Sequence, residues 1–245
     1  MRALVCLFIF ILALVSPTFA SAQPLRIVTE PWGPYVYQDG TALAGIDYEI
    51  ANEVFNRLGV QVQWQFLPWK RCLMMIEEGQ ADAVLDIFRT PTRERQLIYA
   101  NEALSSVEFV LYEANERPQP AARLKSLQGL RVGIAPGFLY GPVFEGSQAQ
   151  KEPAPNLEAN FGKLLLGRVD LVIGDRRQGR FALRQTGLEG RIREIPGTLH
   201  SDVLYLALRR TGELASLAER FASTLQAFKR EPAYRELLKR YDHGP

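Results

Sequence analysis

Charged side chains gather directly after an apolar run in the first half of the chain. Residues 83–85 are apolar and follow a glycine-containing turn, which predicts a short buried strand. Asp86, Arg89, Thr90 and Arg93 then arrive within eight residues. A guanidinium can hold a carboxylate through two parallel hydrogen bonds, and a carboxylate can hold a cation. These residue types could bind a small charged solute; the alternative is a solvated loop with a surface salt bridge.

A helix is expected to begin within this stretch. Pro91 suits the first turn of a helix, and Thr90 is a suitable N-cap before it. The polar groups therefore lie where a strand ends and a helix begins. In open α/β sheets, this is the edge at which ligands bind.

The same design occurs a second time in the chain. Residues 79–86 and residues 167–175 both run from a glycine turn through an aspartate and an apolar strand to a terminal aspartate. The second terminal aspartate, Asp175, could N-cap the helix expected at 176–185 or contact a solute, and the two uses are compatible.

Predicted strands and helices alternate along the chain. From apolar periodicity and from glycine and proline positions, strands are expected at 25–28, 60–66, 83–86, 107–112, 131–134, 171–175 and 203–208. Helices are expected at 46–58, 69–78, 124–129, 161–166, 176–185, 211–229 and 232–241. This order predicts an α/β protein with parallel sheets and covering helices, and the repeat suggests two similar lobes.

Three aromatic residues lie near the predicted strand ends. Trp32 and Tyr35 belong to a loop at 29–35 that is rich in proline and glycine, and Trp69 opens a helix. They could be ordinary core residues. Their positions in a loop and at a helix start favour a pocket role for at least one of them.

The first residues predict export. An apolar run at 3–15 follows Arg2, and Ala20-Ser21-Ala22 fits the small-x-small cleavage pattern, so residues 1–22 are predicted to be a secretory signal peptide. The mature chain would then be soluble in the periplasm, because no second apolar stretch approaches the length that spans a membrane.

Composition excludes several classes of protein. Cleavage would remove Cys6 and leave Cys72 as a single thiol, predicted to be buried and inert, so an internal disulfide is excluded. The full chain has 29 Lys and Arg against 27 Asp and Glu, which gives no general attraction for nucleic acid.

Catalytic signals are sparse. The two histidines, His200 and His243, are far apart, and the sequence has no zinc cluster, phosphate-binding loop, dinucleotide fingerprint or nucleophile elbow. We therefore predict a binding protein rather than an enzyme, with no metal and no cofactor. The enzymatic alternative would use Asp86 or Asp175 as a general acid in a closed cleft.

A series of short motifs runs nearly the whole mature length. They are Gly45-Ile-Asp-Tyr-Glu-Ile before a helix ending in Leu58-Gly59, Gly79-x-x-Asp82, Thr90-x-x-Arg93, Leu127-Gln-Gly-Leu-Arg-Val-Gly133, Gly167-Arg-Val-Asp170 and Lys239-Arg-Tyr241. In order and spacing the chain resembles the bacterial periplasmic solute-binding proteins of family 3, which serve ABC transporters of polar amino acids.

This resemblance implies a two-lobed periplasmic-binding-protein fold of type II. Each lobe would be a mostly parallel sheet flanked by helices, and two crossover strands would join the lobes. Lobe one would comprise residues 23–112 and 201–245, and lobe two residues 113–200. The lobes of such proteins close on a solute like a hinge.

The resemblance also implies roles for single residues. Arg93 would grip the α-carboxylate of the solute, Asp175 would receive its α-ammonium, and Trp32 or Tyr35 would pack on it, while Trp69 would form a pocket wall. The full set of predicted ligand-binding residues is Arg93, Asp175, Trp32, Tyr35, Trp69, Asp86, Thr90 and Arg89.

The sequence departs from the family pattern at three positions. Family members that bind common amino acids usually carry serines where this chain has Asp86 and Arg89. They offer Thr or Ser after the glycine that is Gly137 here, but Phe138 follows it. Asp86 could therefore bind a cation or neutralise Arg89, and the solute could be an amino acid or a related compound.

The predicted function is capture of a small polar solute in the cleft between the lobes. The protein would be a monomer that delivers the solute to an ABC permease in the membrane. One alternative is a ligand-sensing subunit that signals to a membrane receptor. Another is a dehydratase-like periplasmic enzyme on the same fold.

Overall fold

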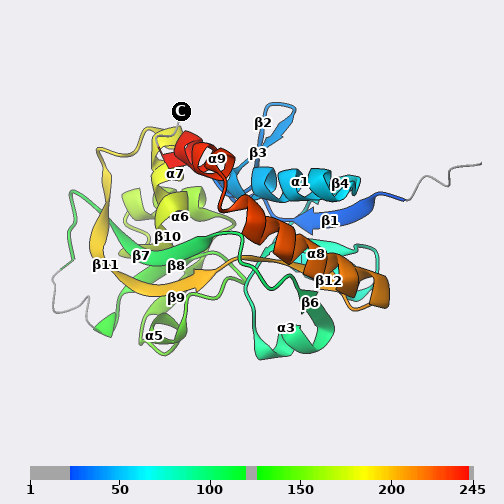
Figure 1. Ribbon diagram of the computed structural model, residues 1–245. Helices are drawn as coiled ribbons and strands as arrows, with labels where there is room; N and C mark the ends of the chain where they lie inside the picture. The colour runs from blue at the N-terminus through cyan, green and yellow to red at the C-terminus, as the bar shows by residue number, and fades with distance from the viewer. Residues whose placement is uncertain (1–22, 120–125, 243–245) are drawn as a thin grey trace, which may run out of the picture.

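The computed structural model describes residues 23–119 and 126–242. The predicted signal peptide with Cys6, the start of the helix predicted at 124–129, and His243 lie outside the described residues. Two five-stranded mixed sheets, each flanked by helices, form the two halves of the molecule (Figure 1).

The first sheet contains the amino-terminal strands and one strand from near the carboxyl end. Its order is β4 (Val62–Phe66), β1 (Leu25–Thr29), β5 (Ala83–Ile87), β12 (Tyr205–Arg209) and β6 (Leu97–Tyr99). β1 pairs in parallel with β4 and β5, whereas β12 runs antiparallel to β5 and β6.

The second sheet contains the middle of the chain. Its order is β11 (Ile192–Val203), β7 (Ser106–Ala114), β10 (Leu171–Asp175), β8 (Arg131–Ile134) and β9 (Gln150–Pro153). β10, β8 and β9 are parallel, and β7 runs antiparallel to β10 and β11. A separate hairpin joins β2 (Tyr37–Asp39) to β3 (Ala42–Ala44).

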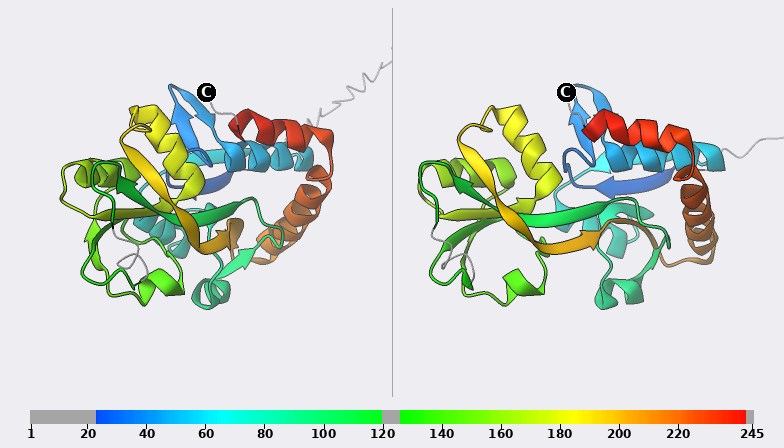
Figure 2. Two further views of the ribbon diagram at one scale, coloured as in Figure 1. Left: turned by 90° about the vertical axis from the view of Figure 1, so that its left-hand side faces the viewer. Right: turned by 60° about the vertical axis from the view of Figure 1, so that its left-hand side comes forward.

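β7 and β11 carry the chain between the two halves. They pair antiparallel, with Val203 opposite Ser106 at one end and Ile192 opposite Ala114 at the other, and they lie side by side in both views of Figure 2. The predicted architecture, two α/β halves joined by two crossover strands, is confirmed. The predicted lobe boundaries at 112 and 200 fall within these two strands.

Helices cover both sheets. Those of the first half are α1 (Ile46–Leu58), α2 (Trp69–Glu77), α3 (Pro91–Gln96), α8 (Gly212–Phe228) and α9 (Pro232–Asp242). Those of the second half are α5 (Pro142–Glu145), α6 (Leu157–Leu165) and α7 (Arg176–Thr186). Phe55 of α1 packs on Phe221 of α8 with ring centroids 4.9 Å apart. Full burial of one such ring is worth about 1.5–3 kcal/mol.

The sequence repeat folds into a structural repeat. Arg26 of β1 donates to both carboxylate oxygens of Asp82, and Arg131 of β8 does the same to Asp170. In each half the guanidinium also donates to the carbonyl of the glycine that opens the turn. β5 and β10 are therefore held next to β1 and β8 in the same way. β10 ends in Asp175, and Asp86 is the last residue but one of β5.

Cys72 is a buried free thiol, as predicted. Its Sγ donates to the carbonyl of Leu67 at 3.5 Å, and burial raises its pKa to about 12. The thiol is therefore protonated and unreactive at neutral pH. Within the described part of the chain, we find no helix with the length and apolar character needed to cross a bilayer.

Candidate functional site

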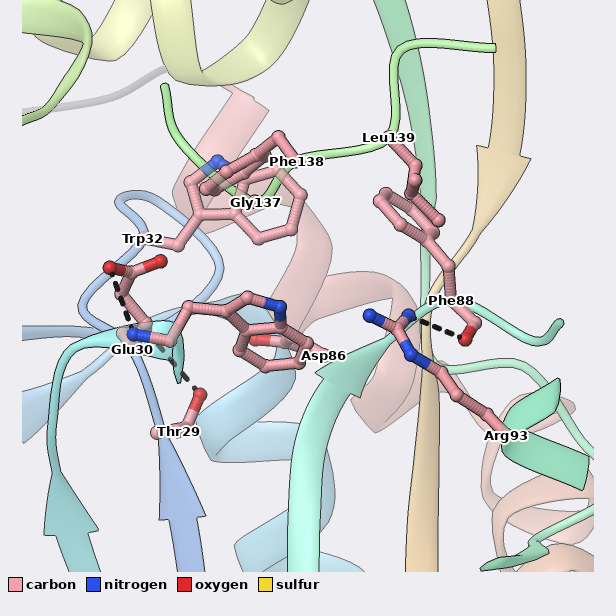
Figure 3. Close-up of a pocket in the computed structure, with 10 residues that line it drawn as sticks. Thr29, Glu30, Trp32, Asp86, Phe88, Arg93, Gly137, Phe138 and Leu139 are labelled. Atoms are coloured by element: carbon pink, nitrogen blue, oxygen red, sulfur yellow. Dashed lines mark hydrogen bonds between the residues drawn. The ribbon is translucent and has the colours of Figure 1, made fainter. Parts of the chain in front are cut away.

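A pocket lies at the carboxyl ends of β1 and β5, where the two halves of the molecule meet (Figure 3). It encloses about 370 Å³ of empty space, which includes space open to solvent. We call it the Arg93 pocket. Residues of the first half that line it are Thr29, Glu30, Trp32, Trp69, Asp86, Phe88 and Arg93, and the second half supplies Gly137, Phe138 and Leu139.

Arg93 belongs to the first turn of α3 and lines the pocket. Thr90 N-caps α3 by accepting a hydrogen bond from the Arg93 backbone N–H at 3.2 Å, as predicted. The guanidinium donates to the Phe88 carbonyl at 3.1 Å and lies 5.5 Å from the centre of the Trp69 ring. Among the described residues, no carboxylate forms an ion pair with Arg93. Burial lowers the pKa of the Arg93 guanidinium. The remaining N–H donors are suited to an anionic ligand group.

Glu30 lies across the pocket from Arg93 (Figure 3). Its Oε1 accepts a hydrogen bond from the Trp69 backbone N–H at 3.3 Å, and burial raises its pKa. Sequence reasoning did not select Glu30. Glu30 follows β1 directly, just as polar residues follow β5, and this position at a strand end could have indicated a ligand-binding residue.

Aromatic side chains form much of the wall. Trp32 is 5% exposed and packs edge-on against Phe138 of the second half, with centroids 5.2 Å apart. It also contacts Tyr35 and Phe88, so it is both a core residue and a pocket residue. Gly137 has φ +86°, a conformation that favours glycine, and it faces Trp69. Phe138, noted as a departure from the family pattern, thus closes the pocket from the second half.

Asp86 lines the same pocket but has unusual surroundings. It is 5% exposed, and its backbone is left-handed with φ 59°. Its neighbour is a second buried carboxyl, Asp47 of α1, which accepts a hydrogen bond from the Ser105 hydroxyl at 2.6 Å. Burial and Asp47 raise the pKa of Asp86 well above its ordinary value, and burial raises the pKa of Asp47 to about 6. The structure shows no ion pair between Asp86 and Arg89 among the described residues.

Asp175, at the equivalent end of β10, does not line the Arg93 pocket. Its Oδ2 accepts hydrogen bonds from the Tyr35 hydroxyl at 2.8 Å and the Gln178 N–H at 2.9 Å, and its Oδ1 accepts one from the Glu108 N–H at 2.9 Å. It is therefore the predicted N-cap of α7. Burial raises the pKa of Asp175 to about 6, although the hydrogen bonds from Gln178 and Tyr35 oppose the shift. Tyr35 and Asp175 line a neighbouring cavity with four arginines of α7. Asp175 also lines a second cavity, which shares Glu30, Trp32 and Phe138 with the Arg93 pocket.

Arg89 and Thr90 line none of these cavities. The Arg89 guanidinium lies between the Tyr99 and Tyr205 rings, 4.9 and 4.8 Å from their centres. It also pairs with Glu94 at 3.4 Å and donates to Asn101 at 3.3 Å. Of the eight residues predicted to bind ligand, the structure brings Arg93, Trp32, Trp69 and Asp86 together in one pocket.

The described residues contain no group of three or more His, Cys, Asp or Glu side chains that could hold a metal ion. The pocket has a basic side chain, Arg93, and two acidic side chains, Glu30 and Asp86, and it lies between two α/β halves that paired crossover strands join. This arrangement is that of a solute-binding protein. The chain belongs to the bacterial extracellular solute-binding proteins, family 3, whose model matches residues 25–244.

The chain is similar in sequence to characterised proteins and similar in fold to solved structures. An L-arginine-binding protein of Pseudomonas aeruginosa is 26% identical over 244 residues, which cover 92% of this chain and 90% of the relative. A histidine kinase sensor domain with similarity to periplasmic binding proteins superposes with a TM-score of 0.78 at 18% identity, over 89% of this chain and 96% of the other. An ancestral arginine-binding protein bound to arginine gives a TM-score of 0.75 at 21% identity, over 89% and 97% of the two chains.

Proposed function

We propose that this protein captures a small zwitterionic solute, an amino acid or a related compound, in the Arg93 pocket and delivers it to an ABC permease. The observation that carries the proposal is the Arg93 guanidinium, half-buried in the pocket and without a carboxylate partner among the described residues. A planar guanidinium matches a carboxylate with two hydrogen bonds, and exclusion of water strengthens that contact.

The opposite wall of the pocket favours a solute that also carries positive charge. Glu30 and Asp86 are both acidic, and Trp32 and Trp69 offer ring surfaces against which an aliphatic or cationic group can pack. Basic amino acids are the leading candidates, which agrees with the arginine named for the relative from Pseudomonas aeruginosa.

Capture would involve movement of the two halves as lobes. We propose lobe one at 23–112 and 201–245 and lobe two at 113–200, with β7 and β11 as the crossover strands. Because residues 137–139 come from the second half and Arg93 from the first, closure would bring both walls onto the solute. The closed monomer would then be the form that a permease recognises. We place it in the periplasm, reached by cleavage of the signal peptide at 1–22.

Thermal-shift screening of the mature protein tests this proposal. The panel is L-arginine, L-lysine, L-ornithine, other amino acids, opines, polyamines and small carboxylates. A compound present at a hundred times its dissociation constant should stabilise the fold by about 2.7 kcal/mol. We expect an amino acid to give the largest shift.

The matched variants are Arg93→Ala and Arg95→Ala. Both remove an arginine from α3, but Arg95 is exposed and lines neither cavity. Arg93→Ala should abolish the shift and leave the unliganded melting temperature nearly unchanged, whereas Arg95→Ala should bind like the parent. Equal binding by Arg93→Ala and the parent would refute Arg93 as the anchor.

A further inference from the structure

Asp86 is a buried carboxyl whose bonding is incomplete. It is 5% exposed and lines the Arg93 pocket, yet no donor among the described residues reaches either of its carboxylate oxygens. Oδ1 of the neighbouring Asp47 likewise receives no hydrogen bond from them. Leaving buried acceptors without donors is costly, and two adjacent buried carboxylates also repel each other. The pair therefore needs a proton or a cation.

Among the described residues, none forms a direct ion pair with Asp86 or Asp47. Ser105 supplies one hydrogen bond to Asp47, and Lys229, whose charge also acts on Asp47, is paired with Glu102 at 2.6 Å. The titratable groups that face the pair from surrounding elements and the shared pocket are Glu30, Tyr35, Arg93, Arg177, Lys229 and Tyr234.

We propose that Asp86, backed by Asp47, is the ammonium subsite of the Arg93 pocket, and that an ammonium group entering it displaces a proton otherwise shared by the two carboxyls. The inference rests on the proposed function, because it concerns the same solute. The ammonium keeps its three hydrogens and donates to the carboxylate oxygens, while the displaced proton passes to the solvent. The only covalent bond that breaks is the O–H bond between this proton and the carboxyl that held it.

Asp86 is better placed for this role than Asp175. The carboxylate of Asp175 already accepts three hydrogen bonds from the protein, so an ammonium there would have to break the contact with Tyr35 or compete with backbone donors. Asp86 accepts no hydrogen bond from a donor among the described residues, so an ammonium there displaces only the proton shared with Asp47. It also lies near the carboxyl end of β5, shortly before the helix that carries Arg93, and it lines the same pocket, which suits two charged groups on neighbouring atoms of one solute.

The proposal makes binding depend on pH with a definite sign. Burial and the neighbouring Asp47 raise the pKa of Asp86, so the free pair holds a proton over a higher range of pH than an ordinary carboxyl does. Binding of an ammonium then releases it, so affinity should rise as the pH rises, by up to tenfold per pH unit while the free pair is protonated.

Isothermal titration calorimetry of the mature protein with L-arginine and L-lysine, in phosphate and in Tris at pH 7, tests the proposal. The difference in binding enthalpy between buffers gives the number of protons released. We expect about one. The deaminated analogues δ-guanidinovalerate and ε-aminocaproate, which lack the α-ammonium, should bind more weakly and release none.

Two variants separate the roles of the carboxyls. Asp86→Asn should lose the proton release and at least tenfold in affinity for L-arginine and L-lysine, yet bind the deaminated analogues like the parent. Asp47→Asn keeps the Asp86 carboxylate and supplies it with a donor, so it should retain affinity for the amino acids and lose the pH dependence. Asparagine also tolerates the left-handed backbone of position 86.

The outcomes distinguish this subsite from the proposed function. If L-arginine or L-lysine binds in an Arg93-dependent way but releases no proton, and Asp86→Asn keeps full affinity, the subsite is refuted while the function stands. The parent should bind the amino acids more tightly than their deaminated analogues. If Asp175→Asn loses this difference in affinity and Asp86→Asn keeps it, the ammonium binds at Asp175. If no amino acid binds, the proposed function fails and the subsite fails with it.

Discussion

Asp86 and Asp175 lie at or next to the carboxyl ends of equivalent strands in the two halves of the molecule, and their surroundings differ sharply. Each belongs to a mostly apolar strand that an arginine–aspartate pair holds in place. Asp175 accepts three hydrogen bonds from the protein, N-caps α7 and connects to Tyr35 of the first half. Asp86 accepts none from the described residues and lies next to another carboxyl.

This difference separates a structural aspartate from one whose bonding a ligand can complete. Hydrogen bonds from the protein stabilise the Asp175 carboxylate and the groups that donate to it. The Asp86 carboxylate is held in the fold without such stabilisation, at a left-handed backbone position and beside a pocket. Unfavourable local chemistry of this kind is typical of functional sites.

The largest expected effect in this comparison is on stability at Asp175. Asp175→Ala removes a helix N-cap, worth about 1 kcal/mol, and takes the carboxylate away from the Tyr35 hydroxyl and the Glu108 N–H. A donor that loses its acceptor costs about 1–3 kcal/mol when buried, although the Tyr35 hydroxyl keeps the Ser106 carbonyl as a partner at 3.3 Å. We expect the free energy of unfolding to fall by about 3 kcal/mol or more, measured by urea denaturation monitored by circular dichroism. A loss below about 1 kcal/mol would mean that these bonds are not structurally important.

Asp86→Asn should have a smaller effect of the opposite sign. In the parent, the raised pKa values of Asp86 and Asp47 mean that the folded state binds more protons than the unfolded state above about pH 4. The free energy of unfolding therefore falls as pH rises, by up to about 1.4 kcal/mol per pH unit for each proton. Removing one carboxyl should reduce this slope and make the unliganded variant more stable than the parent at pH 8.

Urea denaturation of the parent and Asp86→Asn at several pH values between 5 and 8 measures that effect. The gain in stability should be smallest at the acidic end, where the parent pair is protonated, and largest at the alkaline end. A variant that is less stable than the parent at every pH would show that Asp86 has a structural role comparable to that of Asp175.

Much of the fold follows from local sequence signals. Gly59 and Gly187 end α1 and α7 in the left-handed conformation, and Thr90 and Thr211 cap the helices predicted after them.

Short strands at the edges of the sheets were not predicted. β6 and β9 are three and four residues long, which is too short to show periodicity. α6 begins at Leu157 rather than Phe161, because the Asn156 cap lies next to prolines that obscured the start of the helix.

The site was less accessible from sequence than the fold. Arg93 and the aromatics could be selected by residue type and motif. Asp47 could not, because it occupies an ordinary helix position and its importance arises from a contact with Asp86 across 39 residues of chain. The Arg89 guanidinium could bind an anionic ligand group, but it packs between the Tyr99 and Tyr205 rings and does not line the Arg93 pocket. Contacts of this kind depend on how elements meet in space.

A crystal structure of the mature protein in complex with L-arginine would test the central claim most directly. We predict the carboxylate of L-arginine on the Arg93 guanidinium and its α-ammonium at hydrogen-bonding distance, about 2.7–3.2 Å, from Asp86, with the bond between Tyr35 and Asp175 intact. An α-ammonium bound to Asp175 with Tyr35 displaced, or L-arginine bound away from Arg93, would contradict the account.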